Sequence, residues 1–322
     1  TQGTSGITNS FYDSDATGQT TGGGTAKTTA EMLQQATFTD WDFQCETENG
    51  TDDFWGIDEG NDYPRLSWEG IVQLCKSWIG SINTDWSNPN NWSPSGVPAQ
   101  NENLIIDATA QNNLILDQDQ SVGNITFNAA DVNIILGDYD LTFSDSISGA
   151  DADNYIQTNG TGKLTSSIAA NSNMRFEVGR SAYNPVEIQP SVADTFAVLV
   201  KDTIENNNYL NLAIYVNRTW EITKADSQNN NAVDFMYHWN NGDVINGPIN
   251  DPILNHYNGN IWENANGINS PGSGSPILSL SHTNYTGSFS PFAISDDSTP
   301  LPVDFLGMDS ECEGKNSISL TW

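Results

Sequence analysis

The sequence predicts an all-β, multidomain protein, and three observations support this. Short apolar runs recur between Gly-, Asn- and Asp-rich turns at intervals of roughly nine to eleven residues, the spacing of many short strands. Aromatic residues make up 10% of the chain, whereas disordered acidic chains lack them. Helix signals are confined to one short stretch near the N-terminus. With 322 residues, the chain is long enough for two or three domains.

The one helical signal follows a glycine-rich stretch, Thr20 to Gln35, that superficially resembles a phosphate-binding loop. Aligned on Lys27 and Thr28, the pattern G-x-x-x-x-G-K-[ST] requires glycine where Thr21 and Ala26 stand, so the motif fails. The stretch from Thr28 to Glu31 instead has the T-x-x-E spacing of a capping box. We therefore expect a capped helix of one or two turns and no nucleotide site.

Five spaced motifs lie in this region, at Ser10–Asp13, Thr17–Gln19, Gly24–Met32, Phe38–Phe43 and Trp55–Leu66. Together they resemble the closing segment of bacterial GLUG-type repeat regions. The resemblance implies that residues 1–76 form a segment with one short helix that caps a β-solenoid lying upstream. Such repeats also accompany an IgA1-cleaving metallopeptidase, but the three histidines are spaced 18 and 26 residues apart and lack the i, i+4 pairing that a zincin needs.

Residues 77–189 form the second predicted domain. The stretch Asp85–Trp92 leads into apolar runs at Leu104–Ile106, Leu114–Leu116, Ile125–Phe127, Val132–Leu136 and Leu141–Phe143. Their cadence fits either a stack of solenoid turns or a β-sandwich. We favour a right-handed β-helix-like stack and keep the sandwich as the alternative.

Residues 190–297 are predicted to form an antiparallel, Ig-like β-sandwich, because seven strands in about a hundred residues fit that architecture. The expected strands are Phe196–Val200, Leu212–Val216, Trp220–Ile222, Val233–Tyr237, Ile253–Tyr257, Ile277–Leu280 and Phe289–Ile294. Residues 298–322 then read as a proline-stiffened linker and the start of a truncated fibronectin-like module. We expect the chain to be a fragment of a larger secreted protein.

The C-terminal part contains three motifs, at Phe289–Ile294, Leu301–Leu306 and Ser317–Trp322. Through them it resembles type IX secretion substrates of the Bacteroidota. Together with the W-x-x-P-x-N-W pattern of residues 86–92, it is similar to large surface adhesins of that group, including gliding-motility adhesins. The resemblance implies export by the type IX secretion machinery, through parts beyond this chain, and display at the bacterial cell surface.

Composition excludes several classes of partner. Ten Lys and Arg against 41 Asp and Glu give a formal charge of −31, which repels nucleic acid and anionic lipid. No run of 18 apolar residues is present, so no membrane span is expected. The composition is instead compatible with an acidic surface that attracts cations.

Recurring Asp-x-Asp pairs are the candidate calcium ligands, because alternating carboxylates in a loop can point at one ion. The best pairs are Asp13 with Asp15 and Asp151 with Asp153, and a structural Ca²⁺ is the one cofactor we consider. The alternative is that these are solvated turns of an acidic protein.

Other candidate sites are aromatic residues, cysteines and short modification motifs. Trp86 and Trp92 are glycan-contact candidates, although packing as a hydrophobic cap is the favoured alternative. Cys45 and Cys75 are a candidate disulfide. Asp-Ser/Thr motifs resembling O-glycosylation sites of the same phylum occur at Ser146, Thr203 and Ser298.

The sequence offers no pair of nucleophile and base, so we do not expect an enzyme. A glycosidase would need carboxylates such as Glu31, Asp58 or Glu59 placed across a cleft, and a lyase would need clustered basic residues. We therefore expect a non-enzymatic adhesin or stalk that binds a surface glycan or protein ligand. The alternative is a carbohydrate-binding accessory region of a secreted polysaccharide-degrading enzyme.

Overall fold

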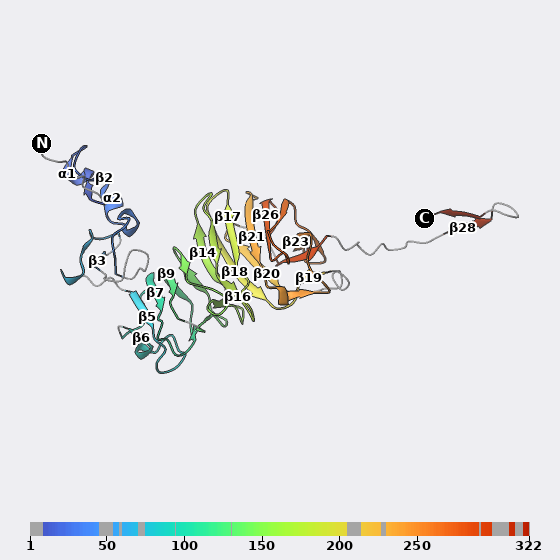
Figure 1. Cartoon of the computed structure of the whole chain (residues 1–322), viewed down its shortest axis with the longest axis horizontal. Helices are drawn as coiled ribbons and strands as arrows, with labels where there is room; N and C mark the ends of the chain where they lie inside the picture. Colours follow the sequence, from blue (N-terminus) through green and yellow to red (C-terminus); the bar gives the residue numbers. More distant parts are fainter. Residues whose placement is uncertain are drawn as a thin grey trace. The chain divides into compact units, whose positions relative to one another are not determined.

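The structure is a computed structural model. It describes residues 9–44, 54–57, 60–69, 75–93, 95–129, 131–204, 214–226, 230–289, 291–297, 309–312 and 318–321. Most of this chain is β structure, which confirms the predicted fold class (Figure 1). The chain divides into two compact units, Thr1–Tyr155 and Ile156–Trp322. The single division lies inside the stretch 77–189 that the sequence suggested as one domain.

The first part of unit 1 contains short helices and two small strand pairs. Its elements are β1 (Phe11–Asp13), α1 (Ser14–Thr17), β2 (Thr25–Lys27), α2 (Thr29–Met32), η1 (Gln35–Thr37), β3 (Trp55–Gly56), β4 (Arg65–Leu66) and η2 (Ser67–Glu69). Strands β1 and β2 pair in parallel, whereas β3 and β4 are antiparallel. Met32, Phe38, Phe43 and Ile57 form the local core.

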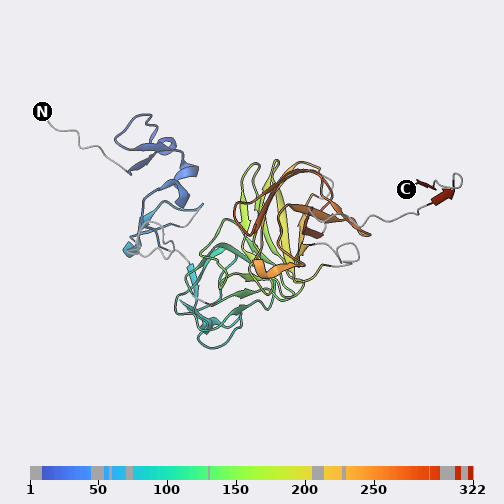
Figure 2. The same ribbon diagram turned by 45° about the vertical axis from the view of Figure 1, so that its right-hand side comes forward.

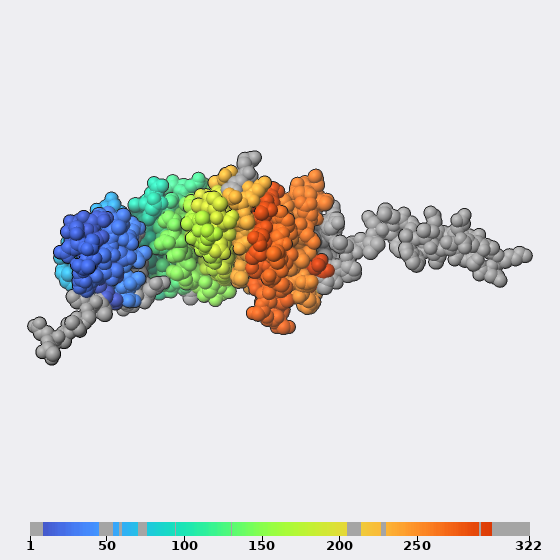
Figure 3. Space-filling model, turned by 90° about the horizontal axis from the view of Figure 1, so that it is seen from above, coloured from blue at the N-terminus to red at the C-terminus, as the bar shows by residue number. Residues whose placement is uncertain are grey.

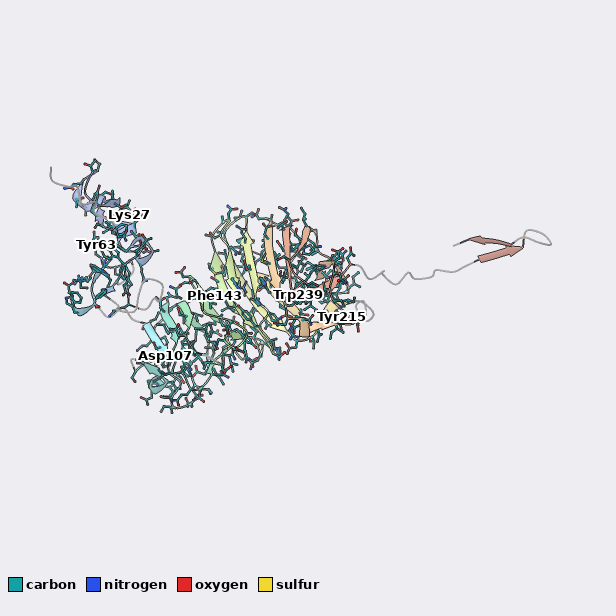
Figure 4. All side chains as sticks on the ribbon, viewed as in Figure 1. Lys27, Tyr63, Asp107, Phe143, Tyr215 and Trp239 are labelled. Atoms are coloured by element: carbon teal, nitrogen blue, oxygen red, sulfur yellow. The ribbon has the colours of Figure 1, made fainter. Side chains whose placement is uncertain are left out.

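The predicted capping box is confirmed at the start of α2. Thr28 Oγ1 accepts a hydrogen bond from Glu31 N at 3.2 Å, and Glu31 Oε2 accepts one from Thr28 N at 2.8 Å. Two orphan N–H groups of the helix are thereby satisfied. Lys27, labelled in Figure 4, lies 3.5 Å from Glu31 Oε1, so the glycine-rich approach leads into a cap and its lysine pairs with a carboxylate.

The rest of unit 1 is built from parallel strands that stack as turns of a β-solenoid, about four turns in all. One sheet contains β5 (Cys75–Trp78), β7 (Glu102–Ile106), β9 (Gln120–Phe127), β11 (Leu141–Phe143) and β12 (Ile147–Ser148). A second sheet contains β8 (Leu114–Ile115) and β10 (Ile134–Ile135), also parallel.

The register gives the length of a solenoid turn. Leu104 pairs with Ile125, which pairs with Ile147, and Leu114 pairs with Ile134. Two of the short apolar runs seen in the sequence therefore make one turn, one run in each sheet. Inward side chains alternate along the strands, as in β7, where Glu102, Leu104 and Ile106 are buried.

Unit 2 contains two antiparallel sheets (Figures 1 and 2). The first has β14 (Leu164–Ile168), β18 (Asp194–Lys201), β20 (Thr219–Lys224), β27 (Pro291–Asp296), β19 (Tyr215–Val216), β22 (Val244–Ile245), β23 (Pro252–Tyr257) and β24 (Trp262–Asn264). The second has, in spatial order, β15 (Met174–Phe176), β17 (Val186–Pro190), β21 (Val233–His238), β26 (Ser279–Tyr285) and β25 (Ile268–Pro271). The short strands β13 (Ile156–Gln157) and β16 (Val178–Gly179) pair in parallel.

Aromatic side chains from both sheets fill the core of unit 2. The Trp220 ring of the first sheet lies 5.2 Å from the Tyr237 ring of the second, and Phe292 lies 5.6 Å from Phe235. Figure 3 shows the outer surface of this unit, coloured from green to red along the chain. A separate hairpin, β28 (Asp309–Cys312) with β29 (Ile318–Thr321), follows beyond residue 308.

Candidate functional site

The first calcium candidates lie at α1, and their carboxylates accept hydrogen bonds from α1, α2 and Tyr63. Asp13 is 7% exposed and caps α1 by accepting from Ala16 N at 2.8 Å. Its other oxygen accepts from the Tyr63 hydroxyl at 2.7 Å, and Asp15 Oδ2 accepts from Thr29 N at 3.1 Å. The bond from Ala16 N is the main cause that lowers the pKa of Asp13. These contacts join α1 to α2 and to Tyr63, which is labelled in Figure 4.

The second candidates, Asp151 and Asp153, lie in one exposed turn. Asp151 Oδ1 accepts from Asp153 N at 2.8 Å and from Asn154 N at 2.9 Å, as in an Asx turn. In the part of the chain that the structure describes, no group of three or more His, Cys, Asp or Glu side chains could hold a metal ion. Calcium at either pair stays a prediction, and a melting temperature lowered by chelator would test it.

The structure places Trp86 and Trp92 in the core, which corrects the glycan-contact hypothesis. Each is 2% exposed, and the Trp92 ring lies 4.9 Å from Trp86 and 5.0 Å from the buried Trp78. Trp92 Nε1 donates to the Trp86 carbonyl at 2.8 Å. Their rings cannot stack on a sugar while buried, and they pack as the hydrophobic cap that was the favoured alternative.

The asparagine of the W-x-x-P-x-N-W pattern explains why this loop folds around its tryptophans. Asn91 is fully buried, and its Oδ1 accepts from the backbone N–H groups of Ile82 and Asn83. Its Nδ2 donates to Asn83 Oδ1 and to the Asp85 carbonyl. The buried Asn91 side chain thus supplies hydrogen-bond partners to the backbone of this loop and holds it in place.

The remaining predicted residues are only partly described. Ser146 and Thr203 are exposed, the minimum condition for modification. Ser298, Cys45, Asp58 and Glu59 lie outside the described residues, and only the backbone of Cys75 and Cys312 is described. The disulfide therefore stays a prediction.

A ladder of asparagine side chains links successive solenoid turns, and sequence reasoning missed it. Asn103 Oδ1 accepts from Asn124 N at 2.9 Å, and Asn124 Oδ1 accepts from Ser146 N at 3.0 Å. In the second sheet, Asn113 Oδ1 accepts from Asn133 N and Asn133 Oδ1 from Tyr155 N, both at 2.9 Å. Donor and acceptor are 20 to 22 residues apart along the chain in each bond, one solenoid turn.

The sequence does carry a signal for this ladder. Asparagine followed by Leu or Ile occurs at positions 103, 113, 124 and 133, once for each half turn. Gly123 is a second signal, because a Cβ added there would lie 2.3 Å from Asn103 Oδ1. The amide of Asn103 occupies the space that a side chain at 123 would take.

A cluster of charged and polar side chains on β15, β17 and β21 is the most site-like group in unit 2. Arg175 Nε donates to both oxygens of Glu177 at 3.1 Å, and its Nη1 donates to Glu187 Oε1 at 2.8 Å. The Tyr183 hydroxyl donates to Glu177 Oε2. His238 Nε2 lies 3.1 Å from Arg175 Nη1 and 3.3 Å from Glu187 Oε1.

The surroundings move the pKa values of the two carboxyl groups in opposite directions. Burial raises the pKa of Glu177 despite Tyr183 and Arg175. Burial also acts to raise the pKa of Glu187, but hydrogen bonds from Asn173, Arg175 and His238 outweigh it and lower the pKa. Burial, with the charge of Arg175, lowers the pKa of His238.

Two carboxyl groups with separated pKa values are also a feature of acid–base catalysis. Here, however, all four carboxylate oxygens already accept hydrogen bonds, from Arg175, Tyr183, His238 and Asn173. A substrate would have to displace these bonds. The chemistry that the cluster performs as it stands is to bind three strands together.

A second, more deeply buried ion pair joins Arg218, the residue before β20, to the short helix η5 (Asn241–Asp243). Arg218 Nη2 lies 2.6 Å from Asp243 Oδ1, with side chains that are 8% and 5% exposed. Asn184 completes the network, because it accepts from Arg218 Nε at 2.9 Å and donates to Asp243 Oδ2 at 2.7 Å. Such a pair requires partners for every polar atom to repay the loss of water.

Comparison with known proteins yields one short match. Over 62 residues, 18% of this chain, the sequence is 49% identical to a protein of Evansella cellulosilytica described as "Putative Gly-rich membrane protein". The match covers only 6% of that protein's length. No family model and no solved structure matches the chain. No helix in the described ranges is long and apolar enough to cross a membrane.

Proposed function

We propose that this chain is a non-enzymatic part of a large secreted adhesin or stalk displayed on a bacterial cell surface. The observation that carries the proposal is the side-chain ladder between solenoid turns, from Asn103 through Asn124 to Ser146 and from Asn113 through Asn133 to Tyr155. Each turn is bonded to the next by side chains as well as by backbone, so the stack resists separation of its turns.

The charge and composition support an extracellular scaffold. A formal charge of −31 keeps an extended surface protein soluble and repels anionic polymers. A protein matched over a short stretch is described as a membrane protein, which is in keeping with a role at the cell envelope. Export through the type IX machinery and a part in gliding motility are the finer forms of the proposal, and they rest on the sequence resemblance.

Surface location is the first test. Antibodies raised against the chain should label intact, unpermeabilised cells of the source organism, and brief protease treatment of those cells should remove the label. Labelling that requires permeabilisation would contradict the proposal. A cytoplasmic protein of the same cells, probed in parallel, reports any leakage.

The second test separates an adhesin from a part of a polysaccharide-degrading enzyme. Beads coated with the chain should adhere to a subset of glycan-coated or protein-coated surfaces, and the soluble chain should compete for that adhesion. The same preparation should release no reducing sugar from a polysaccharide panel. Saturable hydrolysis that is lost in Glu177→Gln would overturn the non-enzymatic proposal.

A further inference from the structure

The last strand of the unit 2 sandwich, β27, has partners along both edges. On one edge it pairs with β23 over five residues, from Pro252 opposite Asp296 to His256 opposite Phe292. On the other edge β20 pairs with its beginning and β19 with its end. All residues of β27 after Pro291 are buried. This is also the strand from which the chain leaves the sandwich.

Four hydrogen bonds around Asp296 and Asp297 hold the end of β27. Its side chain is buried, at 2% exposure, and Oδ2 accepts from the backbone N–H groups of Asn250 and Asp251. Its own N–H donates to the Ile214 carbonyl at 2.9 Å. The next N–H, that of Asp297, donates to the Asp251 carbonyl, also at 2.9 Å.

These bonds connect the end of β27 to both neighbouring strands, β23 and β19. Asn250 and Asp251 immediately precede β23, and Ile214 immediately precedes β19. One residue inward, Asn255 Nδ2 donates to Ser295 Oγ at 2.9 Å, with both residues 5% exposed. The end of β27 therefore cannot lift away from the sheet without first breaking charge-assisted bonds to a buried carboxylate.

We propose that Asp296 is a force-bearing anchor, which holds the end of β27 so that tension on the chain after Asp297 acts on the whole strand. Ladder hydrogen bonds lie perpendicular to a strand. Tension along a held strand must break them together, whereas a released end lets them break one after another. The inference rests on the proposed role as a stalk, because only a stalk carries tension.

Single-molecule force spectroscopy on the full chain, held by its two ends, tests the anchor. Asp296→Ala should raise the rate at which unit 2 unfolds under constant force by about tenfold, since a buried bond to a charged group is lost. Asp296→Asn, which keeps the shape and one acceptor oxygen, should lie between this variant and the unchanged chain. Asp297→Ala is the matched control, because it removes the same charge from the exposed neighbour.

A second pulling geometry separates an anchor from a residue that only stabilises the fold. In this geometry, tension is applied between the N-terminal end and a handle at the exposed Ala193, so it does not pull on the end of β27. The Asp296→Asn variant should therefore unfold at the same rate as the unchanged chain. Equal effects in both geometries, or no effect in the first, would overturn the proposal. If the chain is found at the cell surface but its unfolding rate does not depend on Asp296, the anchor proposal fails and the proposed function stands. If the chain is found inside the cell but its unfolding rate does depend on Asp296, the proposed function fails and the mechanical effect of Asp296 stands.

Discussion

The solenoid of unit 1 and the sandwich of unit 2 link their neighbouring strands through different kinds of polar side chain. Between Lys76 and Lys163 the chain has no Lys, Arg or His, and its solenoid turns are linked by neutral amides such as Asn124 and Asn133. Unit 2 instead uses ion pairs centred on Arg175 and Arg218. Amides can repeat at a fixed period without accumulating charge, whereas each ion pair needs its own opposite partner.

The largest loss of stability is expected when the buried Arg218–Asp243 ion pair of unit 2 is broken. Arg218→Ala leaves Asp243 buried without its cation, and we expect a loss of about 3–5 kcal/mol in the free energy of unfolding of unit 2. Denaturant titration followed by hydrogen exchange of unit 2 peptides measures it. Lys201→Ala is the control, because its pair with Glu221 is about a quarter exposed and should cost about 0–1 kcal/mol. Equal losses in the two variants would show that burial does not make the Arg218–Asp243 pair more important for stability than the more exposed pair.

The solenoid should depend on its amide ladder to a smaller extent. Asn133→Ala leaves the Tyr155 N–H without its acceptor, and we expect unit 1 to lose about 1–3 kcal/mol. Asn128→Ala is the matched control, because Asn128 is exposed and its side chain is not part of the ladder. Hydrogen exchange of residues 95–155 would report both variants. If Asn128→Ala lost as much stability as Asn133→Ala, the amide ladder would not be what stabilises the solenoid.

Mild acid should distinguish the units, since every histidine lies in unit 2. Burial lowers the pKa of His238, His256 and His282 below the ordinary value of 6.5. The unfolded chain then binds more protons than the folded one below pH 6.5, so stability present above this pH is lost as pH falls toward the folded pKa values. We expect faster hydrogen exchange, corrected for intrinsic rates, in unit 2 at pH 6.0 than at 7.5. Comparable destabilisation of unit 1 would contradict this.

Ionic strength should give the smallest difference. Stacked turns of the solenoid place Asp119 beside Asp140, whose N–H donates to it at 2.9 Å, and no basic side chain in this stretch offsets the repulsion. Salt screens such repulsion. We expect unit 1 to gain up to about 1 kcal/mol between low and high NaCl, and unit 2 to change less. A gain that requires Ca²⁺ at matched ionic strength would instead indicate a bound ion.

The same contrast explains how much of the fold followed from the sequence. Strands such as Val233–Tyr237 and Ile253–Tyr257 were predicted because apolar runs bounded by turns need only local information. The antiparallel partners before residue 190 were missed: Val186–Pro190 pairs with Val233–Tyr237, about 47 residues later, and no local pattern encodes that pairing. The turn length of the solenoid was readable from asparagines that precede Leu or Ile, but only once two runs are counted as one turn.

The candidate sites were less predictable, because residue type does not determine exposure. Trp86 and Trp92 have the composition of a glycan platform, yet Asn91 draws the loop inward and buries both rings. Asp13 resembles a calcium ligand in sequence, but the Tyr63 hydroxyl that occupies one of its oxygens comes from 50 residues away. The Arg175 cluster draws on three strands and had no sequence signal.

The tryptophan cap at the start of the solenoid has a consequence for self-assembly. Strand β6 (Trp92–Ser93) runs antiparallel to β5 on the edge opposite β7. An open solenoid edge is a template on which another copy can add a strand in register. The short reversed strand β6 occupies that edge opposite Ser77 and Trp78, with the wrong polarity for a further parallel turn. A second copy that added a strand in register at these two residues would first have to displace β6.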